Sequence, residues 1–122
     1  MSSHPLNLTL RFLLELAALA CMSVWGWKHG DNWLRFVLAI GLPIIAAIVW
    51  ATFAVPDDPS RSGNAPVPVP GIIRLIIELA IFGSAVWALF NSGLSTLSLI
   101  MGIIVIVHYF VSYDRIQWLL SK

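Results

Sequence analysis

The stretch VPDDPSRSGNAPVPVPG, residues Val55–Gly71, divides the sequence into two apolar halves. It holds five of the seven prolines of the 122-residue chain. Prolines at this density end helices and stiffen connectors. The whole chain is 59% hydrophobic and 11% charged, whereas soluble domains carry about 25% charged residues. So few charges cannot cover the surface of a soluble protein of this size, and the sequence therefore predicts helices embedded in a membrane.

Four stretches are long and apolar enough to cross a bilayer, which requires about 20 residues per helix. The predicted spans are residues 8–27, 33–55, 72–90 and 94–111. The proline-rich loop, residues 56–71, connects the second span to the third. Pro43 lies inside the second span and leaves the carbonyl one turn earlier without its backbone donor. We predict an all-α membrane protein, with residues 1–122 forming a single integral membrane domain built as a four-helix bundle.

An internal repeat relates the two halves. The segment LRFLLELA at residues 10–17 aligns without gaps with IRLIIELA at residues 73–80. Each copy begins a predicted helical hairpin, and two spans per unit give both copies the same orientation in the membrane. The pattern predicts two tandem hairpins related as a parallel repeat, with the pseudo-two-fold axis along the membrane normal.

Each copy of the repeat carries an Arg and a Glu four residues apart, Arg11 with Glu15 and Arg74 with Glu78. This spacing places both side chains on one helix face. A charge at mid-membrane costs about 2.5–3.5 kcal/mol, so such residues face protein or water. We predict one buried ionic cluster in which Arg11 meets Glu78 and Arg74 meets Glu15. It either fixes helix packing or forms a proton- or ion-coupled site with both glutamates as acceptors.

Two further groups of polar residues are candidates for a site. Asp57, Asp58, Ser60 and Arg61 form a candidate loop site, because adjacent carboxylates can hold a hard cation. The same residue types are common in turns and helix caps, which favours a rigid connector, and a lid over the ionic cluster is a third interpretation. His108 in the fourth span is a candidate polar partner, although a lone His near a helix end commonly bonds to backbone or lipid headgroups.

Several function classes lack support in the sequence. There is no phosphate-binding glycine loop, no His pair one turn apart and no nucleophile elbow. The net charge of +1 gives no basic face for nucleic acid. The single cysteine, Cys21, excludes a disulfide framework and a thiolate metal cluster. We therefore predict a protein that is not an enzyme, with no catalytic residues, no metal, no cofactor and no nucleic-acid partner.

The distribution of basic residues predicts the orientation. With four spans, the two termini and the proline-rich loop share one side of the membrane. That side holds most of the basic residues, which are Arg11, Arg61, Arg74, Arg115 and Lys122. The other side holds Lys28 and Arg35. Because Lys and Arg are enriched on the cytoplasmic side, both termini are predicted to be cytoplasmic. The tail after residue 111 has the mixed pattern of a helical turn or two at the interface.

The two Arg-x-x-x-Glu motifs, together with VPDDPSRS at residues 55–62 and PVPG at residues 68–71, resemble the YrdB-like family. These are small bacterial four-span membrane proteins of unknown function. The resemblance covers most of the chain and implies four spans and a location in the bacterial inner membrane. It implies no activity, substrate or cofactor.

Three hypotheses about function follow. The first is a non-enzymatic protein that transports or senses a small solute or ion, with Glu15 and Glu78 as the protonatable centre held by Arg11 and Arg74. A chain this short would need a homo-oligomer to enclose a pathway of any width. The second is an accessory or scaffold subunit whose ionic cluster is structural. The third is an intramembrane metal-dependent lipid enzyme that uses Asp57 and Asp58.

Overall fold

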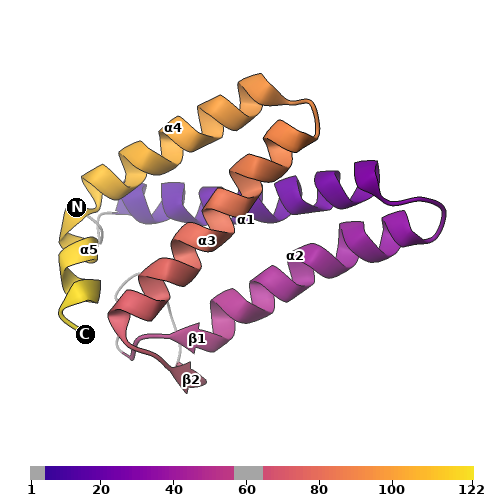
Figure 1. Ribbon diagram of the computed structural model, residues 1–122. Coiled ribbons are helices and arrows are strands. Elements are labelled where there is room, and N and C mark those ends of the chain that lie inside the picture. Colours follow the sequence, from indigo (N-terminus) through magenta and orange to yellow (C-terminus); the bar gives the residue numbers. More distant parts are fainter. Residues whose placement is uncertain (1–4, 57–64) are drawn as a thin grey trace.

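Five helices make up most of the described chain in a computed structural model, which describes residues 5–56 and 65–122 (Figure 1). The helices are α1 (Pro5–His29), α2 (Leu34–Thr52), α3 (Gly71–Asn91), α4 (Ser95–Val111) and α5 (Tyr113–Leu120). Of two strands of two residues each, β1 (Phe53–Ala54) precedes the proline-rich loop and β2 (Val67–Pro68) lies within it. Apart from this strand pair and the connecting turns the described chain is helical, so the predicted all-α class is confirmed.

Helices α1, α2 and α3 are each long and apolar enough to cross a membrane. Helix α4 reaches that length only together with α5, from which it is bent by 69°. The described residues therefore provide three candidate spans, or four if the bent pair is one span.

Helices α1 and α3 form the centre of the molecule (Figure 1). Helix α2 packs mainly along α1, and α4 packs mainly along α3. Within Leu34–Thr52, which is described throughout, no residue of α2 is fully buried. Ala18 of α1 and Ala85 of α3 are completely buried in the core. Small side chains let helices approach closely in a membrane, where packing contacts replace the hydrophobic effect as the main source of association.

The hairpin of α1 and α2 is closed by a contact at the proline. Pro43 has no N–H, so the carbonyl of Ala39 lacks its usual helical donor. The hydroxyl of Ser23 in α1 donates to that carbonyl at 2.7 Å. Close by, a Cβ at Gly26 would lie 2.6 Å from the backbone of Leu38. The absence of a side chain at Gly26 therefore permits the approach, and α2 continues unbroken through Pro43.

Helix α2 ends at Thr52, three residues before the predicted boundary at residue 55. The next two residues form β1, which pairs in parallel with β2 in the register Phe53↔Val67 and Ala54↔Pro68. The pairing draws the chain into extended backbone before Pro56 is reached. The pairing thus holds residues 67–68 of the proline-rich loop beside the end of α2.

The tail after α4 forms α5, whose 8 residues make about two helical turns, as the sequence predicts. Helix α5 packs against α3. Leu119 of α5 is completely buried, and a Cβ at Gly71 would lie 1.6 Å from its carbonyl oxygen. Only glycine at the start of α3 allows α5 to pack this closely.

Candidate functional site

The carboxylate of Glu78 on α3 is the centre of a buried ionic cluster. Its Oε2 atom lies 2.8 Å from Nη2 of Arg11, 2.9 Å from Nε of Arg74 and 2.5 Å from Nη2 of Arg115. Its Oε1 atom accepts a hydrogen bond from the hydroxyl of Tyr109 at 2.9 Å. The Glu78 side chain is 0% exposed. Four donors from α1, α3, α4 and α5 thus converge on one carboxylate.

Arg74 also joins the cluster to the end of α2. Its Nη1 atom donates to the carbonyls of Trp50 at 2.5 Å and Phe53 at 2.8 Å. The last carbonyls of a helix lack intrahelical donors and carry partial negative charge. A guanidinium there donates hydrogen bonds to these carbonyls, and its positive charge is attracted to the negative end of the helix dipole. The indole ring of Trp50 lies 4.5 Å from the Arg74 guanidinium carbon and 5.3 Å from that of Arg11. Trp50 therefore shields the cluster on the α2 side.

The carboxylate of Glu15 is in a different position. Its ion pair with Nε of Arg11 is 3.4 Å long, and its side chain is 26% exposed. Between the described residues there is no ion pair joining Arg74 to Glu15, so the expected symmetric exchange does not form. Arg74 is instead used by Glu78 and the end of α2. The two matched Arg-x-x-x-Glu motifs of the sequence therefore have different surroundings.

His108 lies beside the cluster but does not touch a carboxylate in the described chain. Its Nδ1 atom is 3.1 Å from Oδ1 of Asn7, and Nδ2 of Asn7 donates to the hydroxyl of Ser112 at 2.7 Å. All three side chains are buried. This network links the start of α1 to the junction of α4 and α5, and it holds the bend that brings α5 toward α3.

Three residues were not assigned from the sequence: Arg115 and Tyr109 of the cluster, and Asn7, which hydrogen-bonds to His108 beside it. Arg115 counted only as a basic residue of the tail, yet it is buried against Glu78. One signal was present, because Arg115 is four residues before Leu119 and so shares its apolar helix face. The other candidate residues, Asp57, Asp58, Ser60 and Arg61, lie outside the described residues.

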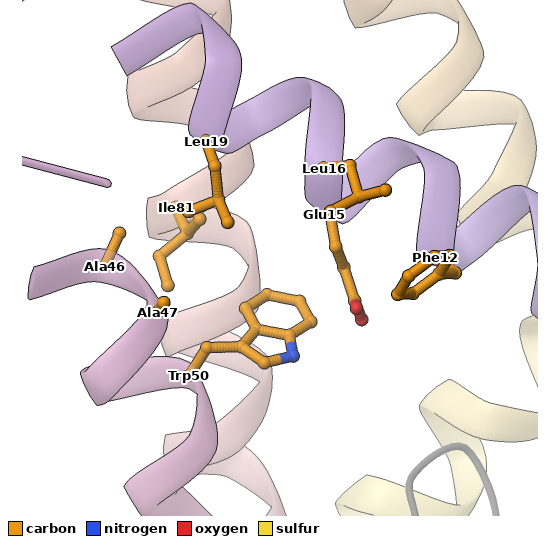
Figure 2. Close-up of a pocket in the computed structure, with 8 residues that line it drawn as sticks. All are labelled: Phe12, Glu15, Leu16, Leu19, Ala46, Ala47, Trp50 and Ile81. Atoms are coloured by element: carbon orange, nitrogen blue, oxygen red, sulfur yellow. The ribbon is translucent and has the colours of Figure 1, made fainter. Parts of the chain in front are cut away.

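A cavity of about 210 Å³ opens beside Glu15. It is bounded by Phe12, Leu16 and Leu19 of α1, by Ala46, Ala47 and Trp50 of α2, and by Ile81 of α3. Figure 2 shows the Glu15 side chain reaching from α1 toward the side of the cavity formed by Trp50. Glu15 is the one acidic side chain among the residues that line it.

Comparison with known proteins assigns the family. A family model described as "Protein of unknown function (DUF2568)" matches residues 9–106. The chain belongs to the DUF2568 family. A relative, the uncharacterized protein YrdB of Bacillus subtilis (strain 168), is 47% identical over 116 residues, which cover 95% of this chain and 94% of the relative. No solved structure matches the chain.

The match confirms the resemblance found from the sequence motifs. The DUF2568 match includes α1, α2 and α3 from residue 9 onward and ends within α4, before α5. Arg11, Glu15, Arg74 and Glu78 lie inside the matched range, whereas Arg115 lies beyond it. The relative covers nearly the whole chain, but its name gives no activity.

Proposed function

We propose that this protein is a non-enzymatic, multi-pass protein of the bacterial inner membrane that transports or senses a small solute or ion through Glu15. The observation that carries the proposal is the difference between the two carboxylates. Glu78 is enclosed by four donors, whereas Glu15 has one long ion pair and faces a cavity. A group that exchanges a proton or ligand must be accessible, so Glu15 is the exchanging group and Glu78 is its support.

The proposal places the chain in the membrane as four spans with both termini in the cytoplasm and the two hairpins as a parallel repeat. The central packing of α1 on α3 supports this arrangement, because the repeated segments lie in these two helices. The convergence of Arg11 and Arg74 on Glu78 supports it as well. A homo-oligomer would close the open side of the cavity against lipid.

Proton flux through reconstituted protein tests the role of Glu15. Proteoliposomes with an entrapped pH-sensitive dye would be given a proton gradient, and the rate of its decay would be measured. The wild-type protein is expected to raise the rate over empty liposomes, and Glu15→Gln is expected to abolish the increase. Asp31→Asn is the matched control, because it makes the same chemical change on an exposed residue outside the cluster. Equal flux through the wild type and Glu15→Gln would contradict the proposal.

The second candidate is a scaffold or accessory subunit. The pairing of Glu78 favours this candidate. Both of its oxygens are paired, with three guanidinium groups and a tyrosine hydroxyl, and a carboxylate bound in this way joins helices together. Under this hypothesis Glu15 has no separate role, and Glu15→Gln would leave every function of the protein intact while Glu78→Gln would prevent folding.

A further inference from the structure

The cavity beside Glu15 has a chemistry that restricts its ligand. Its walls are carbon except for the Glu15 carboxylate and the indole N–H of Trp50, which is only a donor. A hard metal cation needs six or more oxygen ligands, and the described lining offers one carboxylate. A metal ion is therefore a poor occupant, and the apolar walls favour an organic molecule.

The Glu15 carboxylate has one ion-pair partner among the described residues, Arg11. A carboxylate can accept about four hydrogen bonds, and the ion pair of Glu15 is made with Arg11, whose other nitrogen lies closer to Glu78, at 2.8 Å against 3.4 Å. Glu15 lies about 15 Å along α1 from its start, at 1.5 Å per residue, which is near the middle of the helix. Its exposed fraction thus faces an apolar surrounding, where an incompletely paired charge is costly.

We infer that the cavity binds a small hydrophobic monocation, an amine or quaternary ammonium group carried on an apolar body. This inference rests on the proposed role of Glu15 as the exchanging group. The cationic group lies against the Glu15 carboxylate, and the apolar body packs among Phe12, Leu19 and Ile81. The volume of about 210 Å³ is below the range of roughly 300–1,000 Å³ for pockets that take drug-sized ligands. The ligand is accordingly smaller than a typical drug.

Isothermal titration of the protein in nanodiscs, corrected with empty nanodiscs, tests the inference. The probe is benzyltrimethylammonium. Its neutral control is neopentylbenzene, which has the same shape with carbon in place of nitrogen, and its anionic control is phenylmethanesulfonate. The cation is expected to bind at least about tenfold more tightly than either control, because only the cation gains the attraction of a poorly solvated carboxylate. Equal binding of the cation and its neutral isostere would overturn the inference.

Three variants locate the site. Glu15→Gln is expected to weaken binding of the cation by about tenfold or more. Ala46→Leu fills the cavity without changing Glu15 and is expected to abolish binding. Ala80→Leu, the same substitution on an exposed position of α3 outside the cavity, is expected to leave binding unchanged. If Ala46→Leu unfolds at the wild-type temperature and binds the cation as tightly as the wild type, the inference is overturned, even if Glu15→Gln fails to fold.

The flux and binding measurements separate the two proposals. Proton flux that depends on Glu15, combined with no binding of the cation, would overturn the ligand class and leave the proposed function standing. If neither Glu15-dependent proton flux nor cation binding is found, the proposed function and the ligand class are both overturned. Cation binding that Glu15→Gln weakens and Ala46→Leu abolishes supports the inference.

Discussion

Glu78 is the residue on which the packing of the helices depends most. Removing a carboxylate and guanidinium groups from water is expensive, and the expense is recovered only when the geometry is good and every polar atom is paired. Both oxygens of Glu78 are paired, one with three guanidinium nitrogens and the other with the Tyr109 hydroxyl. Without this carboxylate, the three buried guanidinium groups would lose the negative charge that they share.

Replacing Glu78 by Gln is therefore expected to destabilise the protein by about 3–5 kcal/mol, the usual cost of removing one partner from a buried ion pair. The neutral amide cannot compensate Arg11, Arg74 and Arg115. Glu15→Gln is the matched control, and we expect it to cost less than about 1 kcal/mol because its ion pair is long and Arg11 keeps the shorter ion pair with Glu78. The free energy of unfolding, measured by SDS titration in mixed micelles, checks both values. Equal losses in the two variants would show that the cluster is symmetric after all.

At the level of elements, α5 contributes one of the four donors that enclose Glu78. It turns back at Ser112, packs on the start of α3 and brings Arg115 to Glu78. Gly71 permits this packing, since any side chain there would overlap Leu119. The position of α5 therefore depends on Gly71 of α3, and its contact with the cluster is made by Arg115.

Gly71→Ala is expected to displace α5 and to cost about 1–3 kcal/mol, as overpacking does. Gly83→Ala is the control on the same helix, because a Cβ at Gly83 has no described neighbour within 4 Å. That variant should gain about 0.5–1 kcal/mol, since alanine is the better helix former. Amide hydrogen exchange of residues 113–120 reports the displacement, with faster exchange expected in Gly71→Ala alone. Unchanged exchange in this variant would mean that α5 does not depend on the contact.

At the scale of the whole molecule, the number of spans determines whether the two termini lie on the same side of the membrane. If α4 and α5 form one broken span, the chain crosses four times and both termini lie on the same side of the membrane. If only α1, α2 and α3 cross, the termini lie on opposite sides. The basic residues near the termini and the proline-rich loop favour four spans.

Reporter fusions measure this topology. Green fluorescent protein fused after Lys122 is expected to fluoresce, as it does in the cytoplasm, and alkaline phosphatase inserted between Asn91 and Gly93 is expected to be active, as it is in the periplasm. The second insertion site for the phosphatase is the turn of residues 30–33, because it connects α1 to α2 and the insertion does not interrupt a helix. An active phosphatase after Lys122 would contradict the four-span arrangement.

Much of the fold followed from composition and periodicity, because apolar length alone specifies membrane helices. The contact of Arg11 with Glu78 could be predicted from the two matching sequence segments. They place an Arg and a Glu on each of two helices, and opposite charges on neighbouring helices attract each other. The environment of Arg115 did not follow from either. It depends on the 69° bend between α4 and α5, and neither proline nor glycine marks Ser112. The unequal surroundings of Glu15 and Glu78 were missed for the same reason, because α5 brings Arg115 to Glu78.

The position of Arg115 has a consequence for biosynthesis. Arg115 follows Glu78 by 37 residues, and a ribosome adds about 5–20 residues per second. Glu78 therefore emerges about 2–7 s before its third guanidinium partner, at the same elongation rate. During that interval the carboxylate has Arg74 in its own helix and Arg11 in a helix made earlier. The first hairpin thus supplies a counter-ion for the third helix while the second hairpin is still being made.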